Sequence, residues 1–137
     1  MRELGADLTI NYKTTPDWEK QVYELTERIG VDHIVEVGGA GTLAKSLQAV
    51  RYGGHVHLIG VLSGFGGEIS PMPILFKSVT VNGIYVGSRE IFETMNQAIS
   101  QARLKPVIDR IFPFAEAKAA YQYLQSGSHF GKVVIEI

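Results

Sequence analysis

The stretch that most constrains the fold runs from Val31 to Gly41 and reads V-D-H-I-V-E-V-G-G-A-G. A short apolar run over residues 33–37 breaks into three glycines within four residues. Apolar residues then recur at helical spacing, at Leu43, Ala44, Leu47 and Val50. A strand, a glycine turn and a helix in succession are typical of open α/β sheets, which hold nucleotides beyond the carboxyl ends of parallel strands. The stretch therefore predicts a parallel α/β sheet with a candidate ligand site at this turn.

The glycine turn allows three interpretations. Residues 39–44 fit G-x-G-x-x-A, a form of the dinucleotide-binding fingerprint. That fingerprint requires an acidic residue about twenty positions later to hold the ribose, but the chain reads L-I-G-V over residues 58–61. The turn also resembles the glycine-rich loop of methyltransferases that bind S-adenosylmethionine, where the acidic residue after the next strand is again missing. The third interpretation is a turn without a ligand.

Composition narrows the class of protein. The chain has 137 residues, 45% of them hydrophobic and 20% charged, which is typical of one globular domain with a real core. Its net charge of −1 gives no basic patch for nucleic acid or an anionic membrane. It has no cysteine, no apolar run long enough to span a membrane and no signal-peptide pattern at its start. We therefore expect a cytoplasmic protein that binds neither nucleic acid nor membrane.

Strand-like and helix-like segments alternate along the chain. We predict strands at residues 8–10, 33–37, 55–59, 79–86, 107–112 and 132–137. We predict helices at residues 15–30, over about ten residues from Thr42, at 90–102 and at 115–126, with a short helical turn at 71–76. The Gly53-Gly54 pair marks a turn between the helix and the next strand. The strands are apolar throughout, which indicates a parallel sheet with helices on both faces.

Glycine follows three of these strands at their carboxyl ends, at Gly38, Gly60 and Gly87. Neighbouring parallel strands end at the same edge of a sheet. Three glycines there favour a surface kept clear of side chains, which a ligand approaches closely.

Six segments carry a resemblance that covers the whole chain. They read L-G-A-D-L-T-I-N-Y, G-V-D-H-I-V-E-V-G-G-A-G-T-L, R-Y-G-G-H-V-H-L-I-G-V-L, G-I-Y-V-G-S-R, R-L-K-P-V-I-D-R-I-F-P-F-A-E-A and H-F-G-K-V-V-I-E-I. In this order and spacing they resemble the medium-chain (zinc-type) alcohol dehydrogenase and quinone reductase superfamily. The resemblance is to the carboxyl-terminal part of the cofactor-binding domain only.

The resemblance implies a partial doubly wound, Rossmann-like fold that lacks its first two strands. In the superfamily these strands, and a catalytic domain that carries any catalytic zinc, come before the part that Met1 begins. The four strands between residues 8 and 86 would then be the third to sixth of the sheet. Residues 1–137 would form a single incomplete dinucleotide-binding domain, with 106–137 as a strand-helix-strand extension. The G-x-G-x-x-A pattern would be a coincidence at strand four.

The resemblance also implies residues that contact NAD or NADP, and none with a catalytic role. They are Gly38 and Gly39 near the adenosine, Ile59, Gly60 and Val61 beside the nicotinamide, Val86, Gly87, Ser88 and Arg89 as the far wall, and Lys132 at the phosphates.

Three of these positions also have plain structural interpretations. Arg89 falls in the first turn of a helix, where the helix dipole disfavours a cation by roughly a few tenths of a kcal/mol. It therefore either faces an anion or pairs with Glu90 or Glu93. Ser88 suits a helix N-cap, and Lys132 at the start of a strand suits a solvated charge.

His55, His57 and Glu36 lie on predicted strands. The two histidines are two residues apart and share a face of the sheet. No third metal ligand is evident, so we expect structural histidines and no metal site. Glu36 is either a partly buried carboxylate with a raised pKa or a hydrogen-bonded structural residue.

By resemblance, the function is hydride transfer with a nicotinamide cofactor. We expect this fragment to bind the cofactor weakly or not at all and to be inactive alone. Without strands one and two, residues 33–37 form an exposed edge, and residues 79–86 form the other edge. We expect a homo-oligomer through these edges, or pairing with the missing amino-terminal part. The alternatives are a non-enzymatic oligomerising or interaction module and a methyltransferase-like domain that binds S-adenosylmethionine.

Overall fold

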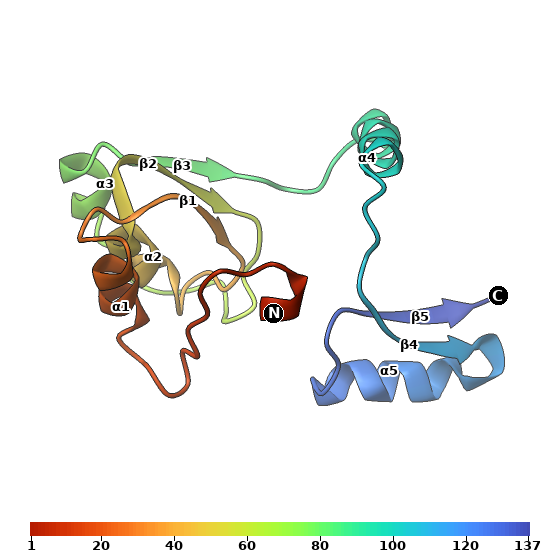
Figure 1. The fold of residues 1–137 in the computed structure, drawn as a ribbon. Coiled ribbons are helices and arrows are strands. Elements are labelled where there is room, and N and C mark those ends of the chain that lie inside the picture. The colour runs from red at the N-terminus through yellow and green to blue at the C-terminus, as the bar shows by residue number, and fades with distance from the viewer. The chain divides into compact units, whose positions relative to one another are not determined.

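The computed structural model describes all residues from Met1 to Ile137 and divides them into two compact units, Met1–Val86 and Gly87–Ile137 (Figure 1). Both units combine parallel strands with helices, which confirms the predicted α/β class. That residues 1–137 form one incomplete dinucleotide-binding domain, with 106–137 as an extension, stays a prediction.

The first unit contains a sheet of three parallel strands. Its elements are η1 (Arg2–Leu4), α1 (Trp18–Leu25), β1 (Val31–Glu36), α2 (Leu43–Ala49), β2 (Val50–Leu58), α3 (Met72–Phe76) and β3 (Thr80–Gly83). The strand order is β1-β2-β3, so β1 and β3 are the edges. The predicted strand at 79–86 is shorter than expected and ends at Gly83.

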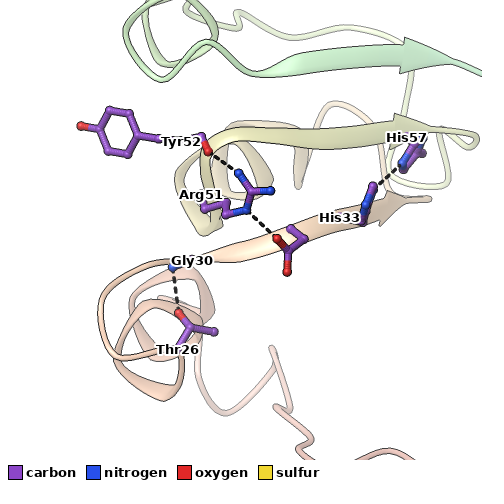
Figure 2. Close-up of polar contacts among 7 residues, drawn as sticks. Thr26, Gly30, His33, Arg51, Tyr52 and His57 are labelled. Atoms are coloured by element: carbon purple, nitrogen blue, oxygen red, sulfur yellow. Dashed lines mark hydrogen bonds and ion pairs between the residues drawn. The ribbon is translucent and has the colours of Figure 1, made fainter.

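Two predicted elements at the start of the chain need correction. Residues 8–10 form no strand, because strand β1 pairs only with β2 and nothing extends the sheet on its other side. The first helix spans Trp18–Leu25 rather than 15–30. It ends early because Glu27 and Arg28 adopt left-handed backbone conformations, with φ of 53° and 66°. Thr26 then connects the helix to the chain that follows, since its hydroxyl accepts a hydrogen bond from the Gly30 amide at 2.9 Å (Figure 2).

The Gly53-Gly54 pair lies inside β2 and not in a turn before it. Val31 pairs with Val50 and His33 pairs with His55, so the register between β1 and β2 is interrupted at this point. Gly53 has a φ of 65°, and an irregularity of this kind is where a left-handed glycine is accommodated within a strand. The strand therefore begins five residues earlier than the sequence predicts.

The core of this unit lies between α2 and the sheet. Its buried residues are Leu43, Leu47, Val50, Val56 and Val79, against which Ile34, Leu58 and Ile74 pack. Helix α2 contacts β1 and β2, and α1 packs on α2 (Figure 1). Alternation along the strands places Ile34 and Val56 on this face, whereas His33, Val35 and His55 lie on the other face.

Lys77 fixes the carboxyl end of α2. Its ammonium group donates hydrogen bonds to the carbonyl oxygens of Leu47 at 3.1 Å and Gln48 at 2.8 Å, and to that of Val50. These are carbonyls that a helix end leaves without partners, and a cation there is favoured by the helix dipole. Burial lowers the pKa of Lys77. The contact ties the short α3 region to the junction of α2 and β2.

The second unit is a two-stranded parallel sheet with a helix on it. Its elements are α4 (Arg89–Gln101), β4 (Ile108–Pro113), η2 (Phe114–Glu116), α5 (Ala117–Ser126) and β5 (Lys132–Glu136). Strands β4 and β5 pair, and α5 packs on both. Asp109 joins them further, because its carboxylate accepts hydrogen bonds from the Tyr123 hydroxyl at 2.7 Å and the Phe130 amide at 3.1 Å. None of the helices in the chain is long and apolar enough to cross a membrane.

We predict that Leu47→Ala lowers the free energy of unfolding of the first unit by about 2–5 kcal/mol, because Leu47 is fully buried and truncation leaves a cavity. Denaturation followed by the fluorescence of Trp18, the single tryptophan of the chain, measures this unit. The control is Leu62→Ala, since Leu62 is 87% exposed. Equal effects of the two substitutions would contradict the assignment of this core.

Candidate functional site

The structure brings five of the ten predicted cofactor residues together at the carboxyl ends of β1 and β2. These are Gly38, Gly39, Ile59, Gly60 and Val61. The Ile59 amide donates to the carbonyl of Glu36 at 2.9 Å, and the Ser63 amide donates to the carbonyl of Gly38 at 2.8 Å. The two segments after the strands are therefore bonded to each other and form one rim.

Glu36, the last residue of β1, organises the glycine turn. The residue is 4% exposed, and its carboxylate accepts four hydrogen bonds. The donors are the Gly38 amide at 2.7 Å, the Gly39 amide at 3.0 Å, the Thr42 hydroxyl at 2.6 Å and the Ser46 hydroxyl. A buried carboxylate is stable only when such donors replace water. Glu36 thus connects the end of β1 to the turn and to the first two turns of α2.

The same donors determine the charge state of Glu36. Burial alone would raise the pKa of this carboxyl, but the hydrogen bonds from Ser46, Thr42, Gly39 and Gly38 outweigh it, so the pKa lies below its ordinary value. Of the two interpretations offered from the sequence, the hydrogen-bonded structural residue is confirmed, and the raised pKa is wrong. Glu36 is therefore ionised at neutral pH.

The amides of the turn are all used within the protein. Those of Gly38 and Gly39 bind Glu36. The Gly41 amide donates to the Ser63 hydroxyl at 2.8 Å, and the Thr42 and Leu43 amides donate to the carbonyl of Gly39 at 3.1 and 2.8 Å. A phosphate-binding turn needs amides that point at the ligand. This turn therefore does not act as a phosphate cradle, in agreement with the missing acidic residue of the fingerprint.

The glycines of the rim are required by the packing of the protein on itself. A Cβ on Gly60 would lie 2.6 Å from the carbonyl oxygen of Val37, and a Cβ on Gly39 would lie 2.8 Å from the Cα of Val61. Gly39 also has a left-handed φ of 81°. The backbones of the two segments thus approach closely, which accounts for these glycines without a ligand.

Exposed apolar side chains flank this rim. Val37 and Ile59 are each 45% exposed and Val61 is 38% exposed. Their polar backbone groups are largely bonded within the rim, so what they offer to a ligand is apolar contact. A flat, partly apolar ring suits such a surface better than a phosphate does.

The other five predicted residues lie around the start of α4 and in β5. Val86 is 80% exposed and has a left-handed φ of 46°, which is strained for a β-branched residue. Ser88 is the N-cap of α4, because its hydroxyl accepts a hydrogen bond from the Ile91 amide at 3.2 Å.

Arg89 forms an ion pair with Glu93 at 2.7 Å, with 90% of its side chain exposed. Lys132 is exposed at the start of β5, where its amide donates to the carbonyl of Val107 at 2.8 Å. Gly87 lies just before the Ser88 cap. A role for these residues in binding a cofactor stays a prediction.

Sequence reasoning did not identify three side chains that complete this region. Thr42 and Ser46 bind Glu36 from α2, and Ser63 bridges the two segments through the Gly41 amide and the carbonyl of Gly38. The sequence contains a signal for Thr42 and Ser46, because hydroxyl residues one turn apart at the start of a helix can face the end of the preceding strand. His33 is a fourth addition, because it joins His55 and His57 on one face of the sheet.

We predict that Glu36→Gln lowers the free energy of unfolding by about 3 kcal/mol at neutral pH, because the amide removes the charge and replaces one of the two acceptor oxygens with an NH₂ donor. Denaturation followed by Trp18 fluorescence measures the change. Glu24→Gln is the matched control, since Glu24 is exposed and only pairs with Arg28 at 3.4 Å, and such a pair contributes about 0–1 kcal/mol.

The effect of Glu36→Gln depends on pH in a definite direction. Because the pKa of Glu36 is lowered in the folded state, its contribution to stability is present above the unfolded pKa of about 4.3 and is lost as the pH falls through the lower folded value. The difference between the original chain and the variant should therefore shrink on acidification. A difference that stays constant from about pH 7 to pH 3 would contradict this assignment.

Comparisons with known proteins agree along almost the whole chain. Residues 4–135 match the family described as zinc-binding dehydrogenase. A zinc-type alcohol dehydrogenase-like protein of Schizosaccharomyces pombe is 37% identical over 99% of this chain and 40% of its own length. A candidate alcohol dehydrogenase from Sinorhizobium meliloti 1021 has a TM-score of 0.87 at 44% identity, over 98% of this chain and 39% of that structure. An NAD-dependent alcohol dehydrogenase has a TM-score of 0.85 at 30% identity, over 99% and 39%.

The described residues do not fit the zinc in the family's description. No three histidine, cysteine, aspartate or glutamate side chains are arranged so that they could hold a metal ion. The chain spans about 40% of the length of the curated relatives it matches. The extent of the family match and the agreement in fold with alcohol dehydrogenases show that this chain belongs to the zinc-binding dehydrogenase family.

Proposed function

We propose that this chain forms part of the nicotinamide-cofactor site of an oxidoreductase of the alcohol dehydrogenase and quinone reductase type. The observation that carries the proposal is the rim of Gly38–Gly39 and Ile59–Val61. It lies at the carboxyl ends of adjacent parallel strands, where open α/β sheets bind their ligands. The family match over residues 4–135 supports the same position.

The chemistry of the rim is suited to orienting a ring and not to gripping phosphates. The exposed side chains of Val37, Ile59 and Val61 can cover one face of a nicotinamide or adenine ring and exclude water from it. The turn amides are already bonded to Glu36. In such enzymes the cofactor carries out hydride transfer, and the protein supplies binding and orientation. We assign no catalytic residue, and we expect the chain to be inactive by itself.

Nicotinamide fluorescence tests the proposal directly. Titration with NADH and NADPH should give weak, saturable binding with a Kd in the range of about 1–10 mM, because the apolar rim contributes without a phosphate clamp. Val61→Asp should abolish it, since a carboxylate would face the ring and repel the anionic cofactor. The control Leu75→Asp changes an exposed residue of α3, away from the rim.

The two outcomes are separable. Saturable binding that Val61→Asp removes and Leu75→Asp leaves unchanged supports the proposal. Absence of saturable binding at about 10 mM cofactor, or equal binding by both variants, removes the cofactor role for this chain.

We propose as a second candidate function that the chain associates with a copy of itself through strand β1. This strand is an edge of the sheet, so its outer backbone groups have no strand partner. Val35 on this strand is 66% exposed. A groove of about 720 Å³ runs beside it, lined by apolar side chains that include Leu8, Ile10, Trp18 and Val22. An open apolar edge is a site for strand addition. No observation favours an S-adenosylmethionine site.

Light scattering after size exclusion tests the association. The original chain should elute with the mass of a dimer or larger species at micromolar concentration. Val35→Lys should shift it toward the monomer, because a lysine on an edge strand blocks strand addition. Leu75→Lys is the control on an exposed helix residue. A monomer for the original chain, or no change with Val35→Lys, would contradict the β1 interface.

A further inference from the structure

Three of the four histidines of the chain lie together on one face of the first sheet. His33 comes from β1, and His55 and His57 come from β2. The ring centroid of His33 lies 5.0 Å from that of His55 and 5.4 Å from that of His57. The ring planes are within 16° of parallel. Strand pairing produces this arrangement, because His33 pairs with His55 and the next residue on the same face of β2 is His57.

The closest contact in this group joins two ring nitrogens. His33 Nδ1 lies 3.1 Å from His57 Nε2 (Figure 2). With metal–nitrogen bonds of about 2.0–2.1 Å, two imidazoles bound side by side to one tetrahedral or square-planar ion have nitrogens about 2.9–3.4 Å apart. The observed separation falls in this range. A metal ion can thus replace the shared proton after a tilt of the two rings, without a change in the strands.

His33 is accessible, and its chain neighbour Asp32 forms an ion pair with Arg51 at 2.5 Å, so these two opposite charges largely offset each other. His33 is exposed, and Val35 beside it is 66% exposed. On β3 the residues that share the face are Thr80 and Asn82, which pair with His55 and His57 and are both neutral. The exposure of His33 leaves room for its ring to tilt, and Thr80 and Asn82 add no positive charge beside the pair.

We propose that His33 and His57 chelate a divalent transition-metal ion of the class that imidazole prefers, such as Ni²⁺ or Cu²⁺. The ligand set is two imidazoles completed by water, because no three side chains converge on one point. His55 stacks on His33 at 5.0 Å and contributes by holding that ring in place. The site lies on the face opposite the α2 core and is independent of the cofactor rim.

Calorimetric titration of the full chain with Ni²⁺ tests the proposal, with circular dichroism to check that each variant is folded. The expected result is one ion per chain. His33→Gln and His57→Gln should each weaken binding by at least about tenfold, since each removes one of two ligands. His55→Gln should have a smaller effect. His129→Gln is the matched control, because His129 lies in the second unit and belongs to no such group.

A second measurement does not depend on the variants. Ni²⁺ is paramagnetic, and at substoichiometric amounts it should broaden the imidazole proton signals of His33 and His57 in the original chain. Binding unchanged in both His33→Gln and His57→Gln, or imidazole signals of His33 and His57 that stay sharp, would overturn the proposal.

Discussion

The buried carboxylate of Glu36 is the interaction on which the rest of the first unit depends. It ends β1 where the chain must reverse into α2, and it satisfies donors from both the turn and the helix. Without an acceptor there, the Gly38 and Gly39 amides and two hydroxyls would be buried and unpaired, each at a cost of about 1–3 kcal/mol. The carbonyl of the same residue receives the Ile59 amide from the segment after β2. One residue therefore sets the position of both halves of the rim.

This constraint also limits what the rim can do. The turn amides donate hydrogen bonds to an internal carboxylate, so they are not free to bind phosphate even though the glycines match a dinucleotide fingerprint. The glycines allow two backbone segments to pack closely, Gly60 against Val37 and Gly39 against Val61. The surface that remains is apolar, which is why the proposed role is contact with a ring. The chain covers about 40% of the length of its curated relatives.

The sequence predicted the regular elements well where local signals and packing agree. The helix at 90–102 is observed at Arg89–Gln101 with its expected Ser88 cap, and the strand at 132–137 is observed as β5 at Lys132–Glu136. The strand predicted at residues 8–10 is wrong because a strand forms only when it pairs with another strand, and a local sequence pattern does not show which partner is present. The Gly53-Gly54 pair predicts a turn because glycine marks irregular backbone, but the irregularity lies within β2.

The candidate site was predictable in part for the same reasons. The positions of Gly38, Gly39 and Ile59–Val61 follow from parallel strands that end at one edge. The bond from Glu36 to Ser46 spans ten residues and depends on how α2 packs over β1. His55 and His57 share a face by simple alternation, whereas His33 joins them only through the interrupted register of β1 and β2. The order of residues along the chain does not show which residues pair across neighbouring strands, so this part of the site could not be predicted.

Hydrogen exchange at single amides tests the central claim most directly. If Glu36 holds the turn, the Gly38 and Gly39 amides should exchange at neutral pH at least about 100-fold more slowly than in an unstructured peptide, whereas Gly66 in the exposed loop should exchange freely. Free exchange of Gly38 and Gly39 in the folded chain would contradict the account, because the carboxylate would then not be bonded to the turn.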